Sequence, residues 1–100
     1  MSAPAPAEPV VHIDNDDVRV TEWRFAPGAA TGWHRHGYDY VIVPVVGGRI
    51  EMVTADGART AVTLEPGKSY HRPAGVKHDV VNGPGGALRF VEVELKHRPG

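Results

Sequence analysis

The chain has 100 residues, about the length of one domain, and such a chain can bury roughly two thirds of the surface that its unfolded form exposes. Its 11 basic and 12 acidic residues nearly balance, and it has no basic stripe with interleaved aromatic residues, so nucleic acid is not an expected partner. The sequence has no cysteine, which excludes disulfides and thiolate metal sites.

The first nine residues, MSAPAPAEP, are rich in proline and alanine, and we expect residues 1–9 to form a disordered or extended tail. They lack the basic and apolar regions of a secretory signal, and no stretch of the sequence approaches the length of a membrane span. The expectation is therefore a soluble cytoplasmic protein, with one domain over residues 10–96 and a C-terminal tail over residues 97–100.

The stretch DVRVTEWRF is the first clear strand signal after the tail. Val18 and Val20 share one strand parity, whereas Trp23 and Phe25 share the other. A β-bulge near Thr21–Glu22 would bring both pairs to one face, and the pattern predicts such a bulge.

The stretch YVIVPVV is almost continuously apolar and β-branched, which is typical of a strand covered on both faces. Pro44 within it predicts an edge position or a bulge, because proline has no N–H to give to a strand ladder. The stretches RIEMVT and RTAVTL then flank ADGA, which predicts a hairpin with Asp56 and Gly57 at its tip.

After a turn at Pro66 and Gly67 the chain continues with the short stretches SYHRP and HDVV, a glycine-rich loop, and ALRFVEVEL. The latter half of that final stretch alternates apolar and polar residues, and no window has a sustained helical period. Eight or nine strands, with turns every eight to twelve residues, predict an all-β sandwich or barrel.

Two histidines, His34 and His36, stand one residue apart directly before the most apolar strand, and strand parity places them on one face. His78 begins a later strand. Three imidazoles that meet inside a small barrel would form a metal site with open positions, and such nitrogen ligands suit iron first, then zinc, nickel, copper or manganese. The alternatives are surface histidines, or core histidines satisfied by hydrogen bonds.

Two segments resemble the two sequence motifs of the cupin family. The first motif is matched at Gly28, His34, His36 and Gly47, and the second at Gly67, Pro73, Gly75, His78 and Asn82. On these positions the chain is identified as a member of the cupin superfamily, similar to small single-domain cupins associated with β-alanine degradation.

The resemblance implies an antiparallel double-stranded β-helix, the jelly-roll barrel of cupins, that forms a homodimer with residues 10–14 available for pairing across the interface. It also implies a divalent transition metal with His34, His36 and His78 as ligands.

The sequence departs from the first motif at one place, because Tyr40 stands where the family has a glutamate ligand. The phenol could bind the metal, could act beside it as a hydrogen-bond donor or catalytic acid, or could simply fill the space. The neighbouring Asp39 would point to the opposite face, unless a bulge at Gly37–Tyr38 turned it round.

Other polar residues are weaker candidates. Strand parity does not decide whether His71 lines the pocket, and His12 and His97 are expected to be solvated near the termini. Arg35 and Arg72 could hold a substrate carboxylate, or could lie on the outer surface of the barrel and promote solubility.

Resemblance to three-histidine cupin dioxygenases implies O2-dependent oxidation of a small anionic metabolite, a carboxylate or a thiol. The alternatives are a metal-assisted isomerase or hydrolase, in which the metal acts as a Lewis acid, and a non-catalytic cupin that binds a small metabolite for sensing.

Overall fold

The computed structural model describes residues 4–96, which form nine β-strands and confirm the all-β, antiparallel jelly-roll architecture. The strands are β1 (Glu8–Asp14), β2 (Val18–Phe25), β3 (His34–Arg35), β4 (Asp39–Val46), β5 (Gly48–Val53), β6 (Arg59–Leu64), β7 (Tyr70–Arg72), β8 (Lys77–Asn82) and β9 (Leu88–Leu95). No helix in this part of the chain is long and apolar enough to cross a membrane.

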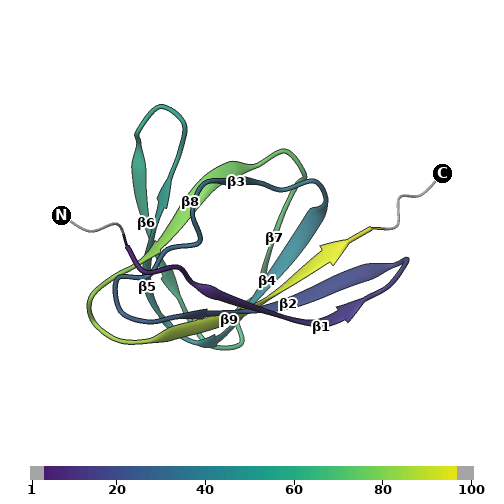
Figure 1. The fold of residues 1–100 in the computed structure, drawn as a ribbon, viewed down its shortest axis with the longest axis horizontal. Coiled ribbons are helices and arrows are strands. Elements are labelled where there is room, and N and C mark those ends of the chain that lie inside the picture. Colours follow the sequence, from purple (N-terminus) through teal and green to yellow (C-terminus); the bar gives the residue numbers. More distant parts are fainter. Residues whose placement is uncertain (1–3, 97–100) are drawn as a thin grey trace.

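The strands form two sheets that curl around a common interior (Figure 1). One sheet has the order β1-β2-β9-β4-β7 and the other the order β3-β8-β5-β6. The largest fully buried side chains are those of Phe25, Pro44, Ile50 and Leu88, so both sheets contribute to the core. Because β9 lies between β2 and β4, it is the central strand of the larger sheet.

The predicted bulge at Thr21–Glu22 is wrong. β2 pairs with β9 without interruption, from Val18 opposite Leu95 to Phe25 opposite Leu88, and the register shift in this region lies in β1. The reason is that both faces of the larger sheet carry apolar side chains. Val18 and Val20 are half-buried on its outer face, and no bulge is needed to turn them inward.

Pro44 lies at a bulge and not at an edge. β4 lies between β9 and β7, and its register against β9 shifts between Pro44 and Val46. The missing N–H of proline therefore falls where the ladder is already interrupted. The Pro44 carbonyl accepts a hydrogen bond from the Gly67 N–H at 3.0 Å, which joins this bulge to the turn that follows β6.

The predicted hairpin is present as β5 and β6, and its turn is closed by the Gly57 N–H, which donates to the Thr54 carbonyl at 2.9 Å. Gly57 has a φ of 83°, in the left-handed region that favours glycine. Gly47 has a different role: a Cβ at that position would lie 2.5 Å from the Leu64 carbonyl oxygen. The motif glycine therefore allows two backbone segments to approach closely.

The N-terminal segment adds a short contact before β1. The Ala7 N–H donates to the Ala30 carbonyl at 2.8 Å, Pro6 forms an isolated bridge with Ala30, and Ala7 is buried. The domain boundaries expected at residues 9 and 96 stay predictions. The expected C-terminal tail of residues 97–100, with His97, lies outside the described residues.

Candidate functional site

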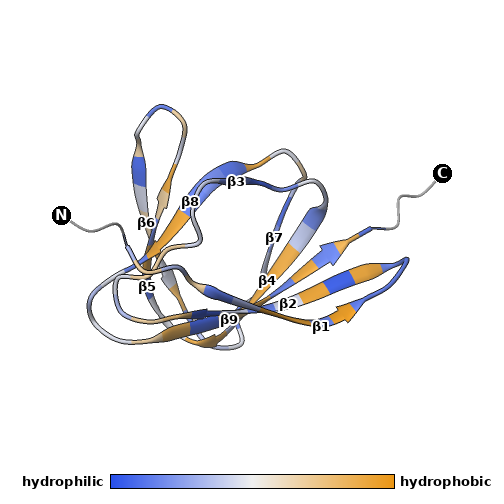
Figure 2. Cartoon of the chain, in the orientation of Figure 1, coloured by the Kyte–Doolittle hydropathy of each residue, from blue (hydrophilic) through white to orange (hydrophobic). Residues whose placement is uncertain are grey.

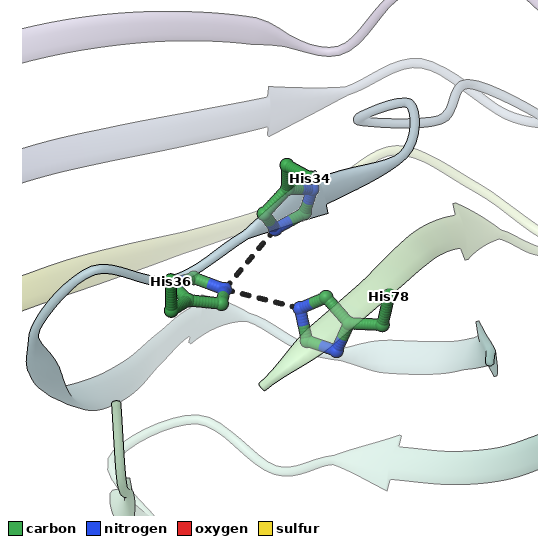
Figure 3. Close-up of side chains that lie close together, drawn as sticks. All are labelled: His34, His36 and His78. Carbon is green, nitrogen blue, oxygen red and sulfur yellow. Dashed lines mark hydrogen bonds between the residues drawn. The ribbon is translucent and has the colours of Figure 1, made fainter. Parts of the chain in front are cut away.

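The structure brings the three motif histidines together in the interior of the barrel (Figure 3). His34 on β3 lies directly opposite His78 on β8, because these two short strands are paired. His36 follows β3, and its backbone is held at both ends: its N–H donates to the Val76 carbonyl at 2.9 Å, and its carbonyl accepts from the Gly75 N–H at 2.8 Å. The turn before β8 therefore positions two of the three imidazoles.

The Nε2 atoms of the histidines face one another. The Nε2 atom of His36 lies 3.1 Å from that of His34 and 3.1 Å from that of His78. Two nitrogen ligands about 2.1 Å from one metal lie about 3.0 Å apart at a right angle and about 3.4 Å apart at a tetrahedral angle. The two distances from His36 fit ligands of a single transition metal, and the ligand atoms of all three histidines lie within 4.8 Å of one another.

The protonation of the histidines also fits metal binding. The Nδ1 atom of His34 lies 2.9 Å from the Gly32 carbonyl, which can only accept, so Nδ1 is placed to donate there and Nε2 is the atom that faces His36. Burial, followed by the nearby His34, lowers the pKa of both His36 and His78 to about 4. Both imidazoles are therefore neutral at pH 7, as metal ligands must be.

Tyr40 lies inside the pocket and stacks on His36, with ring centroids 3.8 Å apart. Burial raises the pKa of the Tyr40 phenol to about 12, with smaller contributions from Tyr70 and Glu92, so the hydroxyl is neutral at pH 7. Asp39 has a separate role, since its Oδ1 accepts a hydrogen bond from the Ala74 N–H at 2.7 Å. This hydrogen bond links Asp39 on β4 to the turn before β8.

Glu92 is a residue of this site that the sequence analysis did not find. The sequence analysis noted only that this strand alternates apolar and polar residues, whereas Leu88, Phe90, Glu92 and Glu94 form its inward row and all are buried. The Oε1 atom of Glu92 lies 3.8 Å from Nδ1 of His36. Burial, followed by the charge of Glu94, raises the pKa of Glu92 to about 7. The shared parity with Phe90 is the sequence signal that could have revealed it.

The space around the histidines has an inner and an outer part. The inner cavity, about 20 Å³, is lined by the three histidines with Tyr40, Tyr70 and Glu92 among others, and it has room for about one water molecule. The outer part is a hollow of about 450 Å³ at the mouth of the barrel, lined by His34, His36, Arg35 and Arg19 among others. A volume of this size suits a small ligand.

Two arginines line this hollow differently. Arg19 is paired with Glu94 through two hydrogen bonds, of 2.7 and 3.0 Å, so its charge is largely matched. Arg35 is exposed on β3 and lies opposite Lys77 of β8. Lys77 does not line the hollow, and the acidic residues Asp14, Glu92 and Glu94 do.

The remaining candidates do not line the inner cavity, although Arg72 lies opposite Tyr40. His71 is exposed on β7 and does not line the inner cavity, whereas its neighbour Tyr70 does. Arg72 is exposed and lies over the Tyr70 ring at 4.8 Å. His12 contacts Glu22 at 2.8 Å on the outer face of the larger sheet.

Comparison with known proteins agrees with this geometry. Residues 21–94 match the Cupin domain family. The chain is 51% identical over 96 residues to the β-alanine degradation protein BauB of Pseudomonas aeruginosa. The match covers 96% of this chain and 100% of that protein.

Two solved structures are also similar. A cupin domain from Bordetella pertussis is 46% identical, with a TM-score of 0.92, and the match covers 97% of this chain and 100% of that one. The polyketide cyclase RemF from Streptomyces resistomycificus is 28% identical, with a TM-score of 0.69, over 99% of this chain and 73% of that one.

Proposed function

The chain belongs to the cupin domain family, and from this we propose that it is a metal-binding cupin in which His34, His36 and His78 hold one divalent transition metal. The observation that carries the proposal is the position of the His36 Nε2 atom, 3.1 Å from that of His34 and 3.1 Å from that of His78, with His36 and His78 buried. Iron is the first expectation, with zinc, nickel, copper or manganese as alternatives.

We further propose that the ligand is a small anionic metabolite. A dication held by three neutral imidazoles keeps its full charge, and it would supply Lewis-acid or redox chemistry at its open positions. The protein adds the guanidinium of Arg35, the arginine of the hollow of about 450 Å³ that is not paired with Glu94. Similarity to a β-alanine degradation protein supports a small carboxylate as one such ligand.

The reaction that we propose first is oxidation by O2. For a thiol the reaction balances with no further reagent, since RSH and O2 give the sulfinic acid RSO2H. Tyr40 is the proposed catalytic residue: its hydroxyl keeps its proton at neutral pH and lies in the inner cavity beside His36, where it can donate a hydrogen bond to a bound anion.

Two alternatives use the same site. A metal-assisted isomerase or hydrolase would need no O2, and a non-catalytic metabolite-binding cupin would show binding without turnover. Elemental analysis of the purified protein tests the metal, and O2 consumption with panels of small carboxylates and thiols separates the alternatives. Metal at one equivalent per chain with O2 uptake supports the first reaction, whereas protein that takes up no transition metal contradicts the proposal.

We also propose that the protein is a homodimer. The outer face of the larger sheet carries half-buried valines from three adjacent strands, and β1 contributes the exposed Ile13. Figure 2 shows hydrophobic segments along β1, β2 and β4 of this sheet. The valines are Val18, Val20, Val41, Val43, Val91 and Val93. The same face has Glu22 beside Arg24 and Arg89, which gives a second copy both an apolar surface and complementary charges. The cytoplasmic location expected from the sequence stays a prediction.

A further inference from the structure

Glu92 is a buried carboxyl group beside the three histidines, and the proposed ligand set does not use it. Its strand, β9, is the central strand of the larger sheet, and only 8% of the residue is exposed. Of the glutamates that the structure describes as buried, Glu22 lies on the outer face with Arg24, and Glu94 is held by Arg19. Glu92 alone among these three lines the inner cavity.

The position of Glu92 relative to His36 is informative. The Nε2 atom of His36 faces the other two imidazoles, and its Nδ1 atom faces Glu92, with Oε1 at 3.8 Å. This distance is longer than a hydrogen bond by about 1 Å, so the hydrogen bond proposed below requires the two side chains to move closer together. His34 has the corresponding contact already, from Nδ1 to the Gly32 carbonyl. An acceptor at Nδ1 keeps the proton there and leaves the Nε2 lone pair for a metal.

The positive charge of a bound dication is a second argument for a role of Glu92. The first cupin motif places a glutamate where this chain has Tyr40, a neutral phenol. Three neutral imidazoles and a phenol leave a dication without a negative partner. Glu92 can supply that partner from the neighbouring strand, because it lies opposite Ile42, two residues beyond Tyr40 on β4.

We propose that Glu92 is the carboxylate of this metal site: it accepts a hydrogen bond from Nδ1 of His36, orients that ligand, and partly compensates the charge of the bound dication. Glu92 is in this sense a positioning residue. The inference rests on the proposed function, since it concerns the same three histidines.

The test is metal affinity in a matched set of variants of the full chain. Glu92→Gln keeps the shape and removes the charge, Glu92→Leu also removes the acceptor, and Glu94→Gln is the control two residues along the same inward row. The probe is Zn²⁺, titrated in competition with a chromophoric chelator. We expect Glu92→Gln to bind Zn²⁺ about 10- to 100-fold more weakly than the wild type, and Glu92→Leu at least as weakly. Glu94→Gln should stay within about threefold of the wild type.

Two further readouts separate positioning from a merely structural role. Without metal, Glu92→Gln should melt at the same temperature as the wild type or higher, because a buried carboxyl has been removed. In ¹⁵N spectra of the metal-free protein, His36 should be the Nδ1–H tautomer in the wild type and a mixture of tautomers in Glu92→Leu.

The outcomes of the Zn²⁺ titrations distinguish the role of Glu92 from the three-histidine metal site on which that role depends. If wild-type protein binds Zn²⁺ and Glu92→Gln binds it no more weakly than Glu94→Gln does, the role of Glu92 is wrong and the three-histidine site stands. If wild-type protein does not bind Zn²⁺, the proposed function itself is wrong.

Discussion

The phenol ring of Tyr40 lies nearly parallel to the imidazole ring of His36, with centroids 3.8 Å apart and planes 18° apart. Tyr40 occupies the motif position of a glutamate, so a stacked aromatic ring replaces a charged ligand at this point of the barrel. The stack fixes the plane of His36 by packing.

Replacing the Tyr40 hydroxyl should leave the metal in place. Tyr40→Phe keeps the stacked ring, so we expect metal content close to that of the wild type, with reduced turnover or ligand binding. Elemental analysis and the activity assay measure the two effects separately. Complete loss of metal in this variant would identify the phenol as a ligand.

Replacing Tyr40 by the glutamate of the motif should strengthen metal binding. Tyr40→Glu places a negative charge beside the dication, and we expect tighter metal binding together with weaker binding of anionic ligands. Competition titration with Zn²⁺ and binding of a small carboxylate measure the two changes. A variant that binds metal more weakly than the wild type would show that position 40 cannot reach the metal.

Removing any one of the three ligands should release the metal. We expect His34→Ala, His36→Ala and His78→Ala each to retain less than about a tenth of the wild-type metal at neutral pH, because two imidazoles bind a divalent ion far more weakly than three. His71→Ala is the matched control, since His71 is exposed on β7. This variant should keep the metal content of the wild type. Full occupancy in all three ligand variants would contradict the site.

The metal-free protein should lose stability in mild acid. The pKa of His36 and of His78 is about 4 in the folded state and about 6.5 in the unfolded state, so the unfolded chain takes up protons first as the pH falls. Each imidazole then contributes about 3 kcal/mol that is present above pH 6.5 and lost by pH 4. Urea unfolding in the presence of a chelator, at several pH values, measures this loss.

Glu92 should oppose that trend. Its pKa is raised from 4.5 to about 7 in the folded protein, so its contribution is fully present below pH 4.5 and is lost as the pH rises through 7. Two histidines outweigh one glutamate between pH 4.5 and 6.5, and the net stability should still fall with acid. Glu92→Gln should make the fall steeper, and an unchanged slope would contradict the assignment.

The outer face of the larger sheet should control assembly. The wild type should sediment at about twice the chain mass of 10.8 kDa. Val43→Glu, on that face of β4 opposite Val91 of the central strand, should give a folded monomer, because a charge would have to be buried in the interface. Thr63→Glu, exposed on β6 of the other sheet, is the control and should stay dimeric. A monomeric wild type at micromolar concentration would refute the dimer.

Gly47 should resist substitution even by alanine. A Cβ there would lie 2.5 Å from the Leu64 carbonyl oxygen, and the backbone would have to separate, which costs about 1–3 kcal/mol. Gly85→Ala is the control, because nothing lies within 4 Å of its Cβ position. Thermal melting of both variants measures the difference, and equal melting temperatures would show that the β5–β6 region adapts without cost.

The motif residues allowed the fold and the histidine cluster to be predicted from the sequence. The spacing of His34, His36 and His78 was sufficient because family motifs specify both the strand positions and the faces of these side chains. The hairpin tip at Gly57 was equally local, since it depends on a few adjacent residues.

The side of each strand that faces inward was harder to predict. On β2 and β9 both faces are partly apolar, so a period of two residues separates the faces without showing which one is the interior. The alternation of Val91, Glu92 and Val93 alone therefore does not reveal that Glu92 faces the interior. Glu92 does so because the interior of the barrel holds a polar site, which breaks the usual relation between burial and hydrophobicity.

The pairing that assembles the histidines also bears on how the chain folds. His36 and His78 lie 42 positions apart in the sequence, and Arg19 and Glu94 lie 75 apart, so the site and the central sheet both depend on distant segments meeting. Domains dominated by such pairings fold in milliseconds to seconds, since the entropy of closing long loops is lost before contacts compensate for it. A metal ion therefore has no complete set of ligands to bind until the barrel has closed, and it should slow unfolding far more than it speeds folding.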